Sequence, residues 1–135
     1  MNMADMFYYA TSFDSDLSNW DVSKVTTLSS TFRRAAFNQP LDSWDVSKVE
    51  TLRYTFRSAS IFNQPLESWD VSSVKTLEGT FDGASAFDQD IGAWDTSSVT
   101  NMSHMFYYAS SFNQILAFDQ TNAYWHTGAV TTMEN

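Results

Sequence analysis

The sequence predicts a single domain, a solenoid of about five stacked coils of about 25 residues, each with short parallel strands and one short helix or helical turn. Three observations predict this fold. Near-identical segments recur, as in FNQPLDSWDVSKVETL from Phe37 and FNQPLESWDVSSVKTL from Phe62. The period is 25 residues, shortened once to 24 near Ala35–Ala36. Tryptophan occupies one position of this period, and phenylalanine occupies two.

The repeating apolar positions predict a core built of columns, because stacking places equivalent side chains about 4.8 Å apart. No coil buries its apolar face alone, so each must bury its neighbour's. The units of the domain (1–135) start near residues 6, 31, 55, 80 and 105, and a six-residue insertion lies within 115–124. The phenylalanine columns are Phe7, Phe32, Phe56, Phe81 and Phe106, and Phe13, Phe37, Phe62, Phe87 and Phe112. The tryptophan column, which we interpret as core rather than as a sugar-stacking surface, is Trp20, Trp44, Trp69, Trp94 and Trp125.

Each unit begins with helical spacing. In the third unit Leu52, Thr55, Phe56 and Ala59 stand at i, i+3, i+4 and i+7, which predicts one face of a short helix. One or two turns are too short to be stable alone, so neighbouring coils must hold this helix. The proline of FNQP then favours extended backbone, and a strand is expected after it, around 41–44.

The two repeating motifs closely resemble those of a known family. NMSHMFYYASSFNQ, from Asn101 to Gln114, follows WDTSSVTNM, from Trp94 to Met102. Together they resemble the repeats of bacterial and mycoplasmal surface lipoproteins, the BspA-like branch of leucine-rich-repeat proteins. The resemblance covers essentially the whole chain. It implies a leucine-rich-repeat-like solenoid at the cell surface or outside the cell, used for adhesion or protein interaction, with no catalytic residues to transfer. The last unit departs from the pattern, since His126 replaces the aspartate after tryptophan.

Composition argues against several classes of function. Seven basic and sixteen acidic residues give a net charge of −9, which repels nucleic acid and anionic membrane surfaces. No apolar run is long enough for a membrane span. The N-terminal segment lacks the pattern of a signal peptide, so an export signal would lie upstream. There is no cysteine, and no nucleophile, metalloprotease or nucleotide motif, so an enzyme is not expected. His104 and His126 occupy non-equivalent positions and are interpreted as plain surface side chains.

An aspartate follows tryptophan in four units, forming the column Asp21, Asp45, Asp70 and Asp95. Stacked carboxylates repel one another, so something must compensate. The favoured interpretation is that each accepts hydrogen bonds from its own turn. The alternative is a calcium ion shared between coils, which would be the only cofactor.

Amide side chains also recur at one pair of positions. They predict a structural ladder in which side chains hydrogen-bond from coil to coil, in preference to a binding role. The pairs are Asn38–Gln39, Asn63–Gln64, Asp88–Gln89 and Asn113–Gln114.

Specific binding is expected at positions that differ between units, because the repeating ones are buried. The pair after the first phenylalanine differs most, and Ser58, Asp82 and Gly83 interrupt an otherwise aromatic and basic series. Such a series is typical of contact surfaces, and the alternative is a solvated helix face. We name this candidate surface the tyrosine–arginine stripe; its members are Tyr8, Tyr9, Arg33, Arg34, Arg57, Tyr107 and Tyr108.

Two functions remain open. The first is a surface module that binds a protein or glycan through the stripe. The second is a structural protein whose copies stack head to tail into filaments. The start NMADMF matches NMSHMF from Asn101, Met133 near the end matches Met3, and neither end shows a polar cap. The chain is therefore expected to be a segment of a longer array or to stack on itself.

Overall fold

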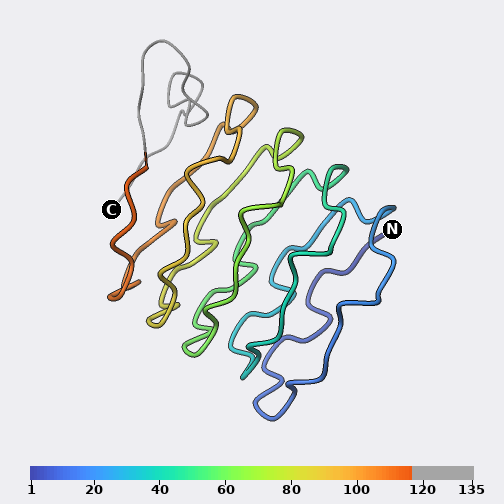
Figure 1. Cartoon of the computed structure of the whole chain (residues 1–135), viewed down its shortest axis with the longest axis vertical. Helices are drawn as coiled ribbons and strands as arrows, with labels where there is room; N and C mark the ends of the chain where they lie inside the picture. Colours follow the sequence, from blue (N-terminus) through green and yellow to red (C-terminus); the bar gives the residue numbers. More distant parts are fainter. Residues whose placement is uncertain (117–135) are drawn as a thin grey trace.

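In the computed structural model, which describes residues 1–116, coils lie side by side from the N-terminal coil onward (Figure 1). Single parallel β-bridges join each coil to the next. They link Asn2 with Thr27, Thr27 with Thr51, Thr51 with Thr76, and Thr76 with Asn101. Taking each coil to begin at its bridge residue, coil 1 is 2–26, coil 2 is 27–50, coil 3 is 51–75, coil 4 is 76–100, and coil 5 begins at 101. Trp125, His126, Met133 and the insertion beyond residue 116 lie outside the described residues.

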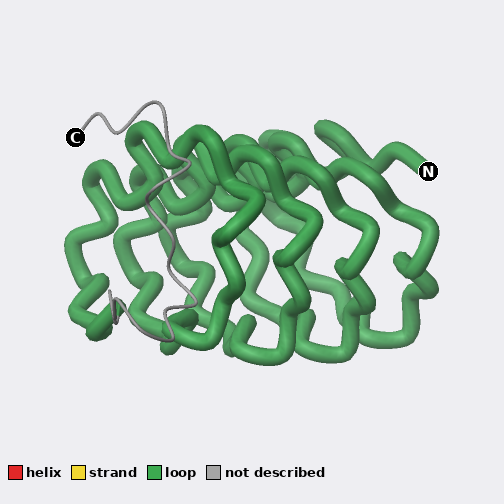
Figure 2. The backbone as a smooth tube through the Cα atoms, turned by 90° about the horizontal axis from the view of Figure 1, so that it is seen from above, coloured by secondary structure: helices red, strands yellow, loops and turns green. Residues whose placement is uncertain are grey.

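The predicted fold class is wrong. Residues 1–116 contain no helix and no strand, so a leucine-rich-repeat-like solenoid with a strand and a helix in each coil does not describe them. The bridges join one residue per coil and build no sheet. Each coil is instead a series of turns and bends, and Figure 2 shows the described backbone as loop throughout.

The segment predicted to be a helix folds into consecutive tight turns. In coil 3 the N–H groups of Thr55, Arg57 and Ala59 donate to carbonyl oxygens three residues earlier, at 3.0–3.1 Å. Tyr54 and Ser58 have φ values of 57° and 55°, in the left-handed region that a right-handed helix excludes. The same two positions have positive φ in every coil: Asp5 and Tyr9, Ser30 and Arg34, Tyr54 and Ser58, Gly79 and Gly83, His104 and Tyr108.

Hydrogen bonds between coils explain why turns replace the helix. Alternate N–H groups of this segment point along the stack: those of Leu52, Tyr54, Phe56 and Ser58 donate to carbonyl oxygens of coil 4 at 2.6–3.1 Å. In an α-helix these N–H groups would form hydrogen bonds within the segment itself and would not reach coil 4. A helix of one or two turns is also only marginally stable in water. The turns keep the apolar side chains inward while giving every second N–H to the neighbouring coil.

The strand expected around 41–44 is also a turn. The N–H of Trp44 donates to the carbonyl of Leu41 at 3.1 Å, which closes a tight turn instead of extending the chain. The equivalent bond joins Trp20 to Leu17, Trp69 to Leu66 and Trp94 to Ile91. The parallel pairing between neighbouring coils is confined to a single bridge residue in each, so no ladder of several residues forms.

The core lies inside the coils and consists of the two phenylalanine columns with tryptophan beside them. Consecutive rings of the first column are stacked with centroids 5.3–5.8 Å apart. Those of the second column are 5.9–6.3 Å apart. Both phenylalanines are fully buried in coils 2 to 4 and partly buried in coils 1 and 5. In coils 2 to 4 each ring therefore packs against counterparts on both sides, and stability depends on contacts between units.

Candidate functional site

The tryptophans of coils 2 to 4 are structural. Their indole Nε1–H groups donate to backbone carbonyl oxygens of the preceding coil: Trp44 to Leu17 at 3.0 Å, Trp69 to Leu41 at 2.9 Å and Trp94 to Leu66 at 3.0 Å. These three side chains are at most 3% exposed, whereas Trp20 of coil 1 is 44% exposed. Buried indoles with satisfied N–H groups offer no face to a sugar.

The carboxylates of the aspartate column accept hydrogen bonds from the turns in which they lie. In coils 1 to 3 one carboxylate oxygen accepts both the backbone N–H and the hydroxyl of the serine two residues later, at 3.1 and 2.6 Å. In coil 4 the N–H of Ser97 donates to Asp95 at 3.0 Å. The hydroxyl and N–H of Ser23 lower the pKa of Asp21, and Ser47 does the same for Asp45. These are the turn hydrogen bonds that the favoured interpretation expects. Within residues 1–116, no group of three or more His, Cys, Asp or Glu side chains is placed to hold a metal ion.

The amide pairs form the expected ladder between coils. Asn38 Oδ1 accepts the backbone N–H of Asn63 at 2.8 Å and the amide of Gln64 at 3.2 Å. The same pair of bonds runs from coil to coil, starting at Asp14 in coil 1 and reaching Asn113 and Gln114 in coil 5. These amides therefore serve the fold, and their positions are not free for a ligand.

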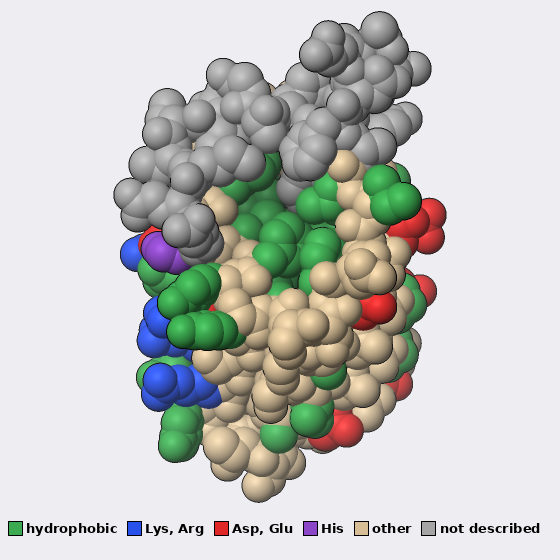
Figure 3. Space-filling model, turned by 90° about the vertical axis from the view of Figure 1, so that its left-hand side faces the viewer, with side chains coloured by type: hydrophobic (Ala, Val, Ile, Leu, Met, Phe, Trp, Pro, Cys, Tyr) green, Lys and Arg blue, Asp and Glu red, His purple; other side chains and the backbone are tan. Residues whose placement is uncertain are grey.

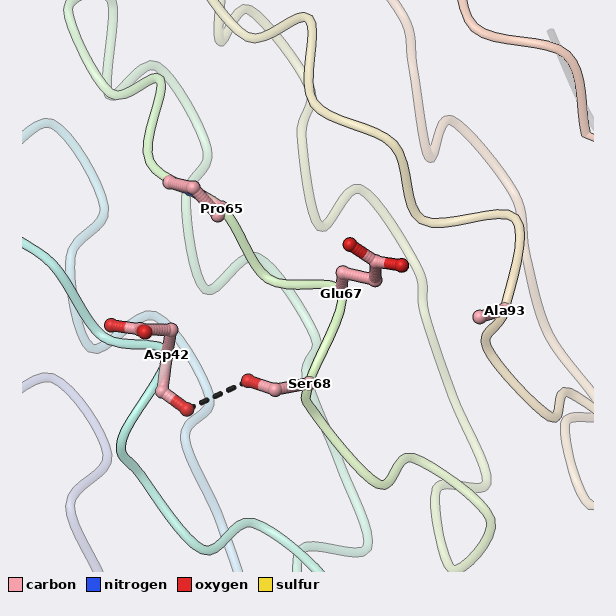
Figure 4. A pocket seen from close by; sticks show the side chains of 5 residues that line it. All are labelled: Asp42, Pro65, Glu67, Ser68 and Ala93. Carbon is pink, nitrogen blue, oxygen red and sulfur yellow. Dashed lines mark hydrogen bonds between the residues drawn. The ribbon is translucent and has the colours of Figure 1, made fainter.

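A shallow depression of about 420 Å³ crosses coils 2 to 4, lined by Asp42, Pro65, Glu67, Ser68 and Ala93 (Figure 4). The hydroxyl of Ser68 donates to the backbone carbonyl of Asp42 at 2.7 Å, so it belongs to the packing between coils. Glu67 and Asp42 are exposed carboxylates, and the lining includes no cation or histidine. The depression lacks the converging polar groups of a ligand site.

The tyrosine–arginine stripe, unlike the depression, brings cationic and aromatic side chains of different coils into contact. Arg33 of coil 2 has its guanidinium carbon 5.4 Å from the ring centre of Tyr8 in coil 1 and 5.7 Å from that of Tyr54 in coil 3. Figure 3 shows Lys and Arg side chains along one edge of the molecule, with hydrophobic side chains between them and most Asp and Glu on the opposite edge. The expected alternation of aromatic and cationic groups is present here. Residues 1–116 contain no helix, so turns form this face instead of the helix that was expected.

Tyr54 lies at the centre of this surface, although its position in the period did not indicate this role. Besides Arg33, the guanidinium carbons of Arg53 and Arg57 lie 4.6 and 5.0 Å from its ring centre. Three cations thus share one ring, an arrangement favoured by the negative face of the aromatic system. The sequence feature that points to Tyr54 is Gly79, at the equivalent position of the next coil. Because Gly79 has no side chain, it leaves the space that the ring of Tyr54 fills.

Two of these cations are neutralised by coil 4. Arg53 Nε lies 3.0 Å from Glu78 Oε2, and Arg57 Nε lies 2.8 Å from Asp82 Oδ2. Glu78 also accepts the hydroxyl of Tyr54 and, at 3.3 Å, the side-chain amide of Asn101. Burial opposes ionisation of Glu78, but hydrogen bonds from Tyr54 and Arg53 and the charge of Arg53 outweigh it and lower its pKa.

Arg33 differs from these two arginines. In the part of the chain that the structure describes, no carboxylate lies within ion-pair distance of it, and its Nε is buried without a hydrogen-bond partner. The reason lies in the neighbouring coils. The positions equivalent to Arg33 in coils 1 and 3 carry Tyr8 and Arg57, and neither is acidic. The position equivalent to Arg57 in coil 4 carries Asp82. Arg34, beside Arg33, is exposed.

The remaining members of the stripe form a second aromatic group on coil 5. The rings of Tyr107 and Tyr108 lie 4.1 Å apart, and the Tyr107 hydroxyl donates to that of Tyr108 at 3.1 Å. That bond raises the pKa of Tyr107. The structure therefore places Arg33 and Arg57 over the ring of Tyr54, and Arg33 connects this ring to Tyr8. Tyr107 and Tyr108 belong to coil 5 and are separated from this group by Asp82 of coil 4. Tyr9 lies beside Tyr8 in coil 1, with their ring centroids 6.2 Å apart.

Fold and surface together define a repeat protein with a packed aromatic core and one edge of aromatic and cationic side chains. The chain belongs to the family described as "Mycoplasma protein of unknown function, DUF285", which matches residues 1–78 and 35–135. No curated protein and no solved structure matches the sequence. The described residues also include no helix able to cross a membrane.

Proposed function

We propose that this protein is a non-catalytic interaction module that binds a protein or glycan at a cell surface or outside the cell, and that the tyrosine–arginine stripe is its contact surface. The observation that supports this most is the cluster of Tyr8, Arg33, Arg57 and Tyr54. Tyrosine and arginine are the side chains that most often dominate binding energy at interfaces. The resemblance to BspA-like surface proteins supports the same function and location.

The geometry of the stripe suits recognition. Tyr8, Tyr9 and Tyr108 are exposed, and their rings expose apolar area without many rotatable bonds. Tyr54 is half-buried and held by Glu78 and Gly79, so the centre of the surface is set before any partner arrives. Preorganised side chains lose less entropy on binding.

The test uses displayed peptide libraries and a glycan array, because both partner classes are open. Ligands selected on the wild-type chain are measured again on Tyr8→Ala with Tyr107→Ala. We expect an affinity loss of about tenfold or more, as for removal of interface aromatics. Ile61→Ala is the control, because Ile61 is 48% exposed, similar to Tyr8 at 44%. Ligands that bind the tyrosine variant as tightly as wild type would remove the stripe from the proposal.

Head-to-tail stacking is the second candidate function, and one observation favours it. Coil 1 presents Trp20, whose counterparts in coils 2 to 4 are buried by the preceding coil. A second copy could cover the exposed ring of Trp20. Light scattering over a concentration series tests this: growth of long species supports stacking, and a mass that stays at one chain at all concentrations contradicts it.

A further inference from the structure

Arg33 is a half-buried cation with one nitrogen that lacks a hydrogen-bond acceptor. Its side chain is half-buried, and its Nε is shielded from solvent without an acceptor. Removing a polar group from water without a hydrogen-bond partner is unfavourable, and more so for a charged one. The faces of Tyr8 and Tyr54 compensate in part, but neither ring supplies an oxygen to the guanidinium edge.

The neighbouring arginines show what Arg33 lacks. The positions of coil 4 that are equivalent to Arg53 and Arg57 carry Glu78 and Asp82. Each arginine forms an ion pair with its acidic counterpart. Arg33 instead faces Arg57 at the equivalent position of coil 3, so two like charges occupy consecutive coils. Like charges at adjacent positions repel, and Arg34 adds a third. A carboxylate from outside would supply the negative charge that Glu78 and Asp82 supply to the other two, and it would reach the guanidinium through its Nη groups, because the Nε of Arg33 is shielded from solvent.

We infer that Arg33, flanked by Tyr8 and Tyr54, is a receptor for a carboxylate of a protein partner, an Asp or Glu side chain with apolar surface beside it. The inference rests on the proposed function and names the chemistry of the partner. Guanidinium binds carboxylate in a planar, bidentate geometry, and the flanking rings would contact the apolar atoms that carry the acid group.

A protein carboxylate suits the site better than a polyanionic glycan for two reasons. Of the arginines around Tyr54, Arg53 and Arg57 are already neutralised, so the site offers one unpaired cation and its neighbour Arg34 rather than a row of them. The chain also carries a net charge of −9, which repels a polymer with many acid groups but tolerates one local ion pair.

The experiment observes the four arginine Nε–Hε groups of the full chain by NMR, with Arg53 and Arg57 as internal controls. The probes are capped glutamate (N-acetyl-glutamate amide) and, as its neutral match, capped glutamine, at constant ionic strength. We expect the Arg33 signal to move saturably with capped glutamate and to stay still with capped glutamine. Arg53 and Arg57 should stay still with both, because their carboxylates are in place.

Two variants test the assignment. Arg33→Gln should abolish the saturable response, read from ring signals of the flanking tyrosines, while Lys24→Gln removes one positive charge elsewhere and should leave it intact. Backbone amide spectra check that both variants fold. An Arg33 signal that moves no more than that of Arg34, or equally with capped glutamine, overturns the inference. So does tighter binding of a sulfated disaccharide in a parallel titration.

These outcomes separate the inference from the proposed function. If selected ligands depend on Tyr8 and Tyr107 but Arg33 ignores capped glutamate, the stripe binds a partner and the carboxylate assignment fails. If Arg33 binds capped glutamate but no selected ligand depends on the stripe, the local chemistry is correct and the interaction function fails.

Discussion

The ring of Tyr54 lies directly over the backbone of Gly79, its counterpart one coil later. A Cβ atom at residue 79 would lie 2.5 Å from two carbon atoms of that ring, closer than real Cβ contacts. Gly79 also has a φ of 53°. The glycine is thus required by a close approach as well as by its conformation, and the approach sets the ring around which three arginines gather.

Gly79→Ala is therefore expected to lower the free energy of unfolding by roughly 2–4 kcal/mol, from overpacking against Tyr54 and from the left-handed backbone. Overpacking should dominate, because Ser58 and other non-glycine residues adopt positive φ elsewhere in the stack. Adding Tyr54→Ala to Gly79→Ala should recover most of the loss caused by the clash. Urea denaturation of the single and double variants checks this; a double variant with additive losses would contradict the steric explanation.

Trp69→Phe removes an indole donor from the core. The hydrogen bond from Nε1 to the Leu41 carbonyl is lost, and that carbonyl keeps only the N–H of Trp44. We expect a loss of about 1–2 kcal/mol from the hydrogen bond and the smaller ring. Trp20→Phe is the matched control, since Trp20 is 44% exposed and should change stability by less than about 0.5 kcal/mol. Equal losses at both positions, measured by urea denaturation, would refute this account of the column.

Thr55→Val tests a hydroxyl shared between two coils. Thr55 Oγ1 is 2.8 Å from the Leu52 carbonyl of its own coil and 3.0 Å from the Leu28 carbonyl of the preceding one. The substitution keeps the shape and removes the donor in a fully buried position, so a loss of about 1–2 kcal/mol is expected. Thr55→Ser, which retains the hydroxyl, should restore part of it. A thermal melt compares these with Thr11→Val, an exposed control; a neutral Thr55→Val would show that the hydroxyl contributes nothing net.

Acid should destabilise the fold through Glu78. Its pKa is lowered in the folded chain below its ordinary value of 4.5, so the folded state binds protons less readily than the unfolded chain. The resulting stability is present above pH 4.5 and is lost as the pH falls through the folded-state pKa. Asp21, Asp45 and Asp88, lowered from 3.8, act in the same direction at lower pH.

Glu78→Gln removes the titrating group and should make the melting temperature less sensitive to pH below 4.5 than in wild type. Melting curves between pH 3 and 7 measure this difference. Glu67→Gln is the control, because Glu67 is exposed and forms no ion pair in the described residues. Parallel wild-type and Glu78→Gln profiles would show that Glu78 does not carry the acid sensitivity.

The repeat was readable from the sequence because identical side chains pack on one another: Phe56 and Phe81 stack 5.6 Å apart because both stand at the same position of the period. The backbone was not readable, since the i, i+3, i+4, i+7 spacing of Leu52 to Ala59 suits either a helix or a series of tight turns with alternate residues inward. What decides between them is a competition for N–H donors between the coil and its neighbour. That competition depends on contacts distant in sequence.

The candidate site was predicted in part. Tyr8, Arg33 and Arg57 were recognised because they break the repeat at equivalent positions. Tyr54 was missed because it lies three positions before Arg57, inside the supposed helix, where its counterparts are Asp5, Ser30, Gly79 and His104. The period aligns Arg57 with Asp82 and Arg33 with Arg57, but spacing alone does not show that such equivalent side chains form an ion pair, as Arg57 and Asp82 do.

The forward donation of alternate N–H groups has a mechanical consequence. Coils 1 to 4 each bind the next coil through the same short row of backbone hydrogen bonds, which lie along the axis of the stack. A tether that pulls one end away along this axis loads one row at a time, so coils detach in succession while the rest stay intact. Each detachment releases one coil, and the chain lengthens in nearly equal steps of about 80–90 Å, the extended length of about 25 residues.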